Sequence, residues 1–258
     1  MRKYRLLRAD PAGNITVFVL DDVPKEERAD LSQRIMAVKE WGAEQVGFVC
    51  SPLEGTAGRM EMAGGEFCGN ASRAFGMYLL QKQGKNAGSI TLEVSGCDHP
   101  ITVTVRDGGA EAEMPLPLFI RKETVDDVSG TLVHLGGIAH FVVEGKEPRK
   151  DFMAQAEPLL AADPSLDAYG VIFVNGDRMD PLIKVSSVNS LVWEGSCGSG
   201  TLAAAVAQSV SMKNGTHTVS LRQPAGTVSA SVTRQDGQIV AAKIGGPVAF
   251  SEVIEVEL

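Results

Sequence analysis

Apolar residues along this chain follow two spacings, one typical of buried helix faces and one typical of strands. Helical spacing of i, i+3, i+4, i+7 and i+8 follows residue 69, with apolar positions at Ala71, Ala74, Phe75, Tyr78 and Leu79. A second helical pattern follows residue 198, with apolar positions at Leu202, Ala205, Val206 and Val210. Both patterns predict helices with a buried face, and the first is expected to end near Gly84 because glycine commonly stops helices.

Short runs rich in β-branched and apolar residues predict strands around these helices. In the first half they cover residues 3–8, 15–20, 44–49, 58–63, 89–94, 101–105 and 111–114, with a hairpin signal at 107–109. In the second half they cover residues 131–135, 140–143, 171–174, 182–185, 190–193, 217–221, 227–232 and 239–244. A capping-box pattern at residues 30–33 predicts the start of another helix, with an apolar stripe at Leu31, Ile35 and Val38, and a further helix is expected at 152–160.

Both halves of the chain show the same order of elements: strand, helix, strand, cysteine-containing turn, helix and further strands. This repetition predicts a duplicated α+β architecture with two pseudo-related lobes. The segment Met114-Pro115-Leu116-Pro117 is expected to end the first half. We therefore expect lobes at residues 1–115 and 116–258, with the last strand able to cross back to the first lobe.

A Cys-Gly-polar turn directly precedes each buried helix, at Cys68-Gly69-Asn70 and at Cys197-Gly198-Ser199. The free N–H groups and the dipole of a helix N-terminus favour negative charge. This position is therefore expected to lower the pKa of a thiol and to bind a ligand carboxylate. One such turn in each half predicts a single site to which both halves contribute.

Composition and charge exclude several classes of function. The net charge of −8 argues against a nucleic-acid partner and against an anionic membrane, since both need clustered Lys and Arg. No apolar run approaches the roughly 20 residues that span a bilayer. The N-terminus lacks the apolar stretch of a signal peptide, so a cytoplasmic protein is expected. Four scattered cysteines and four histidines without CxxC or HExxH spacing predict neither a disulfide scaffold nor a metal site.

Free cysteines are usually packing residues, and that interpretation suits Cys50 in an apolar strand and Cys97 at a turn. Cys68 and Cys197 differ, because each is flanked by glycine and polar residues at the same position before a helix. One thiolate can remove a proton from carbon while an opposite thiol delivers a proton to the other face. A cysteine hydrolase would need one cysteine with a histidine base. A bilobed carboxylate-binding protein, which needs no thiol, is the alternative without catalysis.

The two cysteine turns resemble those of the diaminopimelate epimerase-like superfamily, the cofactor-independent two-cysteine amino-acid racemases and epimerases. The resemblance runs from Pro11-Ala12-Gly13-Asn14 to Gln223-Pro224-Ala225-Gly226. It implies two lobes, each a curved, mostly antiparallel sheet around a central helix, with the site in the cleft. It also implies an amino acid as substrate and neither pyridoxal phosphate nor metal. Members of the superfamily often form dimers, so the resemblance admits a homodimer.

Within the superfamily, the chain is most similar to the histidine racemases that make D-histidine for opine-type metallophores. The stretches that carry this likeness are Gly13-Asn14-Ile15-Thr16, Glu44-Gln45-Val46-Gly47-Phe48, Val94-Ser95-Gly96-Cys97 and the Trp193-Glu194 pair before the second cysteine turn. The resemblance implies interconversion of L- and D-histidine. A diaminopimelate epimerase and a racemase of another amino acid are the alternatives.

The positions at which this chain departs from diaminopimelate epimerases also favour a histidine racemase. Those enzymes carry an Arg that reaches the far carboxylate of the substrate, whereas this chain has Ser187-Val188-Asn189-Ser190 in that region. A buried carboxylate without a charged partner is costly, so diaminopimelate suits this chain poorly. Their Gly-Asn-Pro-His segment is replaced by residues 136–140, and His140 is expected to be structural.

The resemblance also assigns roles to residues. Cys68 and Cys197 would exchange the roles of base and acid. Backbone N–H groups of Gly69, Asn70, Gly198 and Ser199 would hold the α-carboxylate. The remaining candidates are Asn14 and Gln45 at the substrate end, and Glu44 and Glu194, which would contact the substrate amine or imidazole or serve as solvated carboxylates.

Overall fold

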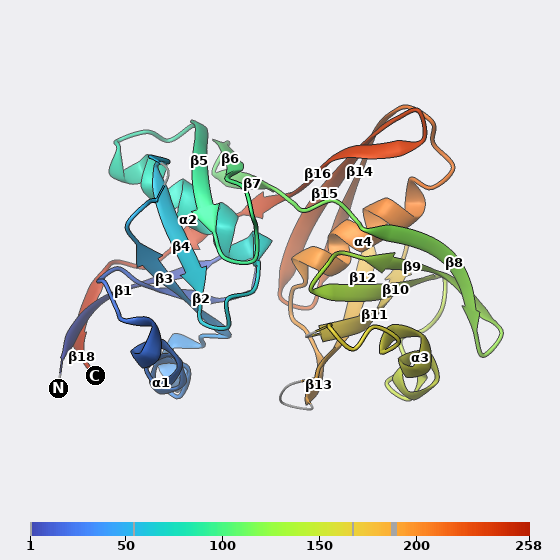
Figure 1. Cartoon of the computed structure of the whole chain (residues 1–258), viewed down its shortest axis with the longest axis horizontal. Helices are drawn as coiled ribbons and strands as arrows, with labels where there is room; N and C mark the ends of the chain where they lie inside the picture. The colour runs from blue at the N-terminus through green and yellow to red at the C-terminus, as the bar shows by residue number, and fades with distance from the viewer. Residues whose placement is uncertain (1, 54, 167, 187–189) are drawn as a thin grey trace. The chain divides into compact units, whose positions relative to one another are not determined.

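The computed structural model describes residues 2–53, 55–166, 168–186 and 190–258 (Figure 1). The chain divides into two compact units. Unit 1 comprises Met1–Glu113 and Gly245–Leu258, and unit 2 comprises Met114–Ile244. Within the described part of the chain, no helix is both long enough and apolar enough to cross a bilayer.

Unit 1 is a mixed sheet with two principal helices. Its elements are β1 (Lys3–Asp10), β2 (Thr16–Val19), α1 (Lys25–Met36), the 3-10 helix η1 (Lys39–Trp41), β3 (Gln45–Cys50), β4 (Gly58–Met62), α2 (Gly69–Lys82), β5 (Gly88–Val94), β6 (Ile101–Arg106), β7 (Gly109–Glu113), β17 (Ala249–Phe250) and β18 (Ile254–Glu257). Antiparallel pairs β1–β2, β3–β4, β5–β6 and β6–β7 are joined by parallel pairs β2–β3 and β4–β5.

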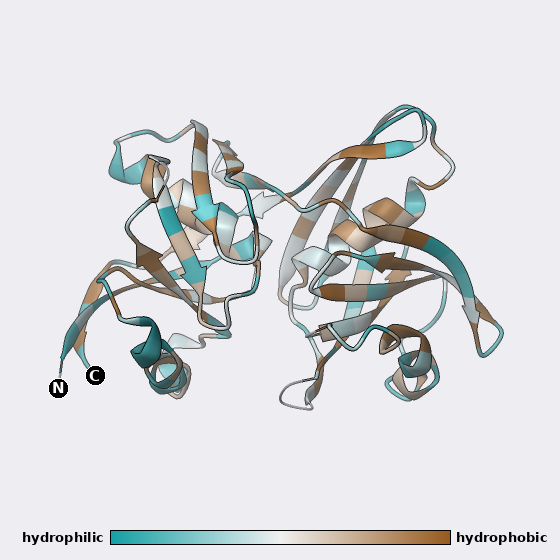
Figure 2. Ribbon diagram, viewed as in Figure 1, coloured by the Kyte–Doolittle hydropathy of each residue, from teal (hydrophilic) through white to brown (hydrophobic). Residues whose placement is uncertain are grey.

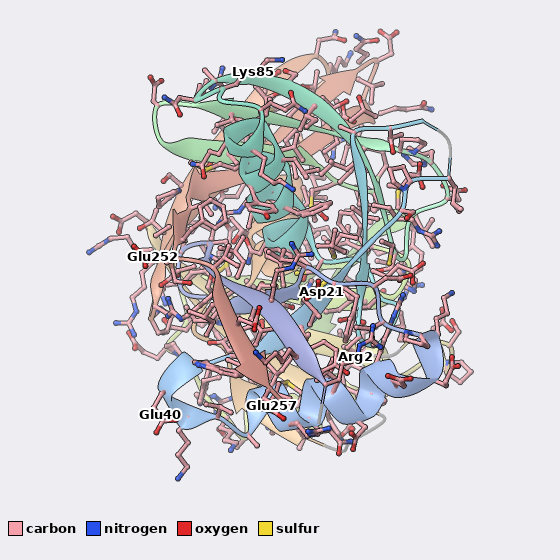
Figure 3. The ribbon with its side chains drawn as sticks, turned by 90° about the vertical axis from the view of Figure 1, so that its left-hand side faces the viewer. Arg2, Asp21, Glu40, Lys85, Glu252 and Glu257 are labelled. Carbon is pink, nitrogen blue, oxygen red and sulfur yellow. The ribbon has the colours of Figure 1, made fainter. Side chains whose placement is uncertain are left out.

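The end of the chain completes unit 1 rather than unit 2. Strand β18 pairs antiparallel with β1, with Tyr4 opposite Val256. Figure 3 faces this edge, where Arg2 and Glu257 are labelled on neighbouring segments. The N–H and carbonyl groups of Arg2 and Leu258 also bond to each other. The two ends of the chain therefore share one sheet edge.

Unit 2 repeats this plan. Its elements are β8 (Phe119–Val125), β9 (Val128–His134), β10 (Ile138–Glu144), α3 (Phe152–Leu160), β11 (Ala168–Asn175), β12 (Arg178–Val185), β13 (Ser190–Trp193), α4 (Gly198–Gln208), β14 (Gly215–Gln223), β15 (Gly226–Gln235) and most of β16 (Gln238–Pro247). The pairs β9–β10, β11–β12 and β14–β15 are antiparallel, and β10–β11 and β12–β14 are parallel.

The parallel pairs β2–β3 and β10–β11 each place a ring opposite a glycine. Phe18 lies opposite Gly47 in the β2–β3 pair, and His140 lies opposite Gly170 in the β10–β11 pair. A Cβ built on Gly47 would lie 2.9 Å from the Phe18 ring, and one built on Gly170 would lie 3.1 Å from Nδ1 of His140. Gly47 makes room for the Phe18 ring, whereas Gly170 makes room first for Ile183 and the Leu182 carbonyl and then for His140. In the matching pair of strands, His140 occupies the place in unit 2 that a core phenylalanine occupies in unit 1.

The helices that follow the cysteine turns are the most buried of the described helices. In α2 the predicted face residues Ala71, Ala74 and Phe75 have no exposed surface, and in α4 the same holds for Leu202 and Val206. Figure 2 shows α4 in brown and white, whereas α1 is mostly hydrophilic teal. Burying side chains of this size stabilises the fold by about 2 kcal/mol for each large apolar residue. The two cysteines are thus anchored to the centre of each unit.

The mixed α+β fold and nearly all predicted strands are confirmed, but several details are wrong. Helix α1 begins at Lys25 rather than at residue 30, because Pro24 precedes it and Glu26 and Glu27 suit the positive end of the helix dipole. Val38 lies beyond the end of α1, and Val210 lies beyond the end of α4 and is exposed. Strands β8, β17 and β18 were not expected, and the sequence of β8 is polar and mostly solvent-facing.

Candidate active site

Cys68 and Cys197 hold the same position in their units, as the residue that caps the N-terminus of α2 and of α4. Their backbone angles are nearly identical, with φ and ψ of −128° and 107° for Cys68 and −124° and 106° for Cys197. Each sulfur accepts a hydrogen bond at 3.4 Å from a backbone N–H of the first helical turn, that of Ala71 or Gly200. The cap places each sulfur at the positive end of a helix dipole.

A hydroxyl four residues after each cysteine completes the cap. The carbonyl of Cys68 accepts a 2.7 Å bond from Ser72 Oγ, and the carbonyl of Cys197 accepts a 2.7 Å bond from Thr201 Oγ1. The backbone N–H groups of the same two residues bond to these carbonyls as well. Both cysteines are therefore fixed by the same set of local bonds.

Polar side chains from the start of β3 and from the β1–β2 loop surround the first thiol. Nε2 of Gln45 lies 3.2 Å from Cys68 Sγ and 2.9 Å from Asn14 Oδ1. Asn14 Nδ2 donates to Glu44 at 3.0 Å, and Asn70 Nδ2 donates to Asn14 Oδ1 at 3.3 Å. The structure thus brings Asn14, Glu44, Gln45 and Asn70 together beside Cys68.

A buried cation, Arg73, is hydrogen-bonded to this network through Asn70. Its guanidinium donates to Oδ1 of Asn70 and to the carbonyls of Pro11, Gly246 and Pro247. Burial lowers the pKa of Arg73 to about 10, so the group stays charged at neutral pH. The attraction between Arg73 and a Cys68 thiolate favours the charged forms of both.

Gln223 and Thr201 fix the backbone of the second turn. Oε1 of Gln223 accepts a 2.7 Å bond from the Cys197 N–H, and its Nε2 donates to Thr201 Oγ1 at 2.9 Å. Gln223 is buried, so both bonds are shielded from water. The turn that follows Gln223, the last residue of β14, also holds the residues just before the cysteine, through a bond from the Ala225 N–H to the Gly195 carbonyl.

A chain of hydrogen bonds links the fully buried His140 to the second thiol. Nε2 of His140 lies 2.9 Å from Ser199 Oγ, which lies 3.5 Å from Cys197 Sγ. Nδ1 has no hydrogen-bond partner among the described residues, and a buried lone pair without a partner costs less than a buried N–H without one. The geometry therefore favours the tautomer in which Nε2–H donates to Ser199 and Ser199 donates to the sulfur.

His140 is too weak a base to deprotonate Cys197. Burial lowers its pKa to about 3, whereas burial, followed by the charge of Glu194, raises the pKa of the Cys197 thiol well above its ordinary value. The bond from Ser199 acts in the opposite direction, since a hydroxyl that donates to the thiolate stabilises it. His140 is structural, as the sequence suggests, and it also orients Ser199.

The expectation that the helix N-termini lower the thiol pKa values is wrong for the protein without substrate. Burial raises the pKa of Cys68, and the N–H of Ala71 and the amide of Gln45 offset only part of that rise. The pKa of Cys197 is raised well above its ordinary value, first by burial and then by the negative charge of Glu194. The desolvation of a thiolate thus outweighs the dipole at both positions.

Replacement of His140 by Phe should raise the pKa of Cys197, because Ser199 loses the donor that orients it. We expect kcat to fall about tenfold, the value of a hydrogen bond of roughly 1.4 kcal/mol. Phenylalanine already occupies the corresponding place in unit 1, so the fold should tolerate it. Thiolate absorbance against pH, with the other three cysteines changed to serine, measures the pKa.

Ser199→Ala is the matched control for this variant. It should raise the pKa of Cys197 in the same direction, and the double variant should show no further rise because both changes break one chain of bonds. A Cys197 pKa that stays unchanged in His140→Phe would show that His140 only fills space.

Sequence reasoning missed Arg73, Gln223 and the link between His140 and Ser199. Arg73 carried one usable signal, since a cation in the first turns of a helix opposes the dipole and lies here among apolar residues. Nothing in the local sequence indicates that Gln223 caps a turn 26 residues earlier.

The family model described as "Histidine racemase CntK N-terminal domain" matches residues 3–253. The chain belongs to this family. A histidine racemase of Fusobacterium nucleatum subsp. nucleatum is 34% identical over 78% of this chain and 80% of its own length. A histidine racemase of Staphylococcus aureus is 26% identical over 87% of each chain. The protein is accordingly an isomerase of the racemase class.

Solved structures share the fold at low sequence identity. A hydroxyproline epimerase from Agrobacterium vitis, with trans-4-hydroxy-L-proline bound, superposes with a TM-score of 0.67 at 14% identity, covering 99% of this chain and 92% of that one. A phenazine biosynthesis protein of the PhzF family from Enterococcus faecalis has a TM-score of 0.63 at 14% identity over the whole of both chains. The architecture of this chain is therefore the one that these proteins have.

Proposed function

We propose that this racemase interconverts L- and D-histidine by moving the α-proton between two thiols, with Cys68 and Cys197 acting on opposite faces of one α-carbon. The observation that carries the proposal is the repeated cap, in which two cysteines share one backbone geometry and one set of local bonds. A packing role for the cysteines would require neither the matched geometry nor the polar side chains around each sulfur.

In the proposed reaction, one cysteine reacts as a thiolate and takes the α-proton, which leaves its electron pair on the α-carbon and the carboxylate. The other cysteine reacts as a thiol and delivers its proton to the opposite face, which yields the mirror configuration. The charge that develops on the substrate carboxylate is stabilised by the backbone N–H groups of Gly69, Asn70, Gly198 and Ser199 at the two helix N-termini. Neither α2 nor α4 has an acidic residue in its first turn.

The charges near the two sulfurs indicate which cysteine is the base and which is the acid in the free enzyme. Arg73 favours a thiolate at Cys68 and Glu66 opposes it, whereas Glu194 favours a protonated thiol at Cys197, whose pKa is raised well above its ordinary value. Leu202 occupies the place in α4 that Arg73 occupies in α2, so the second turn lacks a corresponding cation. We therefore take Cys68 as the base and Cys197 as the acid in the more populated form of the free enzyme, with the roles exchanged after each turnover.

Glu194→Gln tests this assignment through the pH profile. Loss of the carboxylate should lower the pKa of Cys197, so the alkaline limb of kcat/KM should move to lower pH in the direction where Cys197 is the acid. Glu66→Gln is the contrast: the Glu66 charge raises the pKa of Cys68, so its loss should move the acidic limb instead. Identical profiles for both variants would contradict the assigned roles.

Recognition of histidine would use the carboxylates and amides around the cysteine turns. We assign Asn14 and Gln45 to the substrate end and Glu44 and Glu194 to the amine or the imidazole. The mutual bonds of Asn14, Glu44 and Gln45 hold these groups in one network beside Cys68. Residues 187–189, where diaminopimelate epimerases place an Arg, lie outside the described residues.

A substrate panel tests the proposal. Reduced enzyme is given L-histidine, D-histidine, LL-diaminopimelate and other L-amino acids, and the products are separated on a chiral column. We expect kcat/KM to be highest for both histidine enantiomers. Turnover of diaminopimelate alone would make the protein a diaminopimelate epimerase and would contradict the proposed substrate.

The cellular setting is part of the same proposal. Two free thiols are maintained in a reducing compartment, which supports a cytoplasmic reaction. A homodimer and a role in metallophore biosynthesis follow from the resemblance to histidine racemases.

A further inference from the structure

We propose that Cys97, Asp98 and His99 form a binding site for a divalent cation of the zinc class, separate from the catalytic cysteines. The three residues lie on the turn between β5 and β6 of unit 1. One donor atom from each lies within 4.8 Å of the other two, and no other group of three such residues occurs in the searched part of the chain. Thiolate, imidazole and carboxylate are the ligands that zinc prefers.

The distances suit a common metal. Sγ of Cys97 lies 3.8 Å from Nδ1 of His99, close to the roughly 3.5 Å that separates sulfur and nitrogen ligands of a tetrahedral zinc ion. Nδ1 of His99 lies 2.7 Å from Oδ1 of Asp98. In the neutral ring the proton on Nδ1 moves to Nε2, so a cation that takes its place would meet all three donors after a small separation of the nitrogen and the oxygen, and the Cys97 thiol supplies the one proton that is released.

The backbone of the turn positions Cys97 in advance. Ser95 Oγ accepts a 2.9 Å bond from the Met62 N–H and donates a 2.7 Å bond to the Glu66 carbonyl. Gly96 has a φ of +69°, and a Cβ built on it would lie 2.3 Å from the backbone nitrogen of Phe67. Only glycine allows the turn to lie this close to residues 66 and 67. The position of the thiol is therefore fixed by a braced turn.

The three side chains differ in exposure in a way that suits an open metal site. Cys97 packs partly against the apolar core around α2, whereas the side chains of Asp98 and His99 are 97% and 67% exposed. The protein supplies three donors, and water or a small chelating molecule completes the coordination from the solvent side. Binding replaces the proton of the Cys97 thiol with the metal, so one proton is released for each cation bound.

The donor set selects among cations. A thiolate and an imidazole favour zinc, cobalt, nickel and copper over magnesium and calcium, which prefer oxygen ligands. The sequence-based expectation of no metal site considered only CxxC and HExxH spacings, and three consecutive ligands on a turn fall outside both.

Titration with cobalt(II) tests the proposal directly. The protein carries Cys68→Ser and Cys197→Ser, so that the catalytic thiols cannot bind the metal, and the charge-transfer band from sulfur to cobalt is recorded. We expect one cobalt per chain, displaced by zinc, and release of one proton in a weakly buffered solution. Absence of a saturable band at a 1:1 ratio would overturn the proposal.

Single changes then identify the ligands. Cys97→Ser should abolish the band, and His99→Ala and Asp98→Asn should each weaken binding at least tenfold. Cys50→Ser and His217→Ala are matched controls away from the turn and should leave the titration unchanged. A band that persists in Cys97→Ser, or that disappears in Cys50→Ser, would place the metal elsewhere and refute this site. Circular dichroism checks that each variant is folded.

Discussion

Serine in place of either Cys68 or Cys197 should reduce racemisation by about 10³-fold or more, the upper range of what a general acid or base contributes. A hydroxyl keeps the hydrogen bonds of the cap but is a far poorer acid and base than a thiol at neutral pH. The same local bonds hold both sulfurs, so the fold should tolerate either change. Conversion of L-histidine and of D-histidine, measured on a chiral column, gives the rates.

Two controls accompany these variants. Cys50→Ser and Cys97→Ser should keep full racemase activity, because neither cysteine caps a helix. Each catalytic single variant should retain one cysteine that is able to exchange the α-proton of one enantiomer only. Full racemisation by both Cys68→Ser and Cys197→Ser would eliminate the two-thiol mechanism.

Arg73→Met should lower both stability and activity. The guanidinium serves three backbone carbonyls, those of Pro11, Gly246 and Pro247, and methionine would leave them without these donors. Loss of these buried bonds should cost about 3–5 kcal/mol of the free energy of unfolding, the range for breaking a buried ionic network. The loss of positive charge should also raise the pKa of Cys68. Urea unfolding and the pH profile of kcat/KM measure the two effects separately.

Two further variants separate charge from hydrogen bonding. Arg73→Lys keeps the charge near Cys68 but cannot form the same fork of bonds, so it should lose stability and keep most of the pH profile. Leu202→Met, at the corresponding place in α4, should lower the free energy of unfolding by less than about 1.5 kcal/mol, because leucine and methionine have similar volumes. Equal losses of stability in Arg73→Met and Leu202→Met would contradict the role of the buried guanidinium.

Local sequence patterns were sufficient to predict both cysteine caps. Glycine and a polar residue after each cysteine, followed by apolar residues at helical spacing, predicted α2 and α4. The duplicated order of strands followed from the same kind of pattern. Helix α1 was placed too late in the sequence, because a capping-box pattern inside the helix looked like its beginning.

Contacts between distant residues could not be predicted in this way. Arg73 bonds to carbonyls 62, 173 and 174 residues away, and no local pattern indicates such partners. The thiol pKa values were predicted in the wrong direction, because the helix dipole is visible in the sequence whereas the degree of burial is not. His140 was recognised as structural, but its bond to Ser199 depends on the β10–β11 register.

The most direct test of the two-thiol account is early racemisation of L-histidine in D2O, followed by NMR and mass analysis of both enantiomers. Two thiols predict that the D-histidine formed carries deuterium at the α-carbon from the start, because the second thiol has exchanged with solvent. The remaining L-histidine should keep its α-proton at low conversion. Deuterium that enters remaining L-histidine as fast as the product, or protium that is carried into D-histidine, would indicate a single base and would contradict the account.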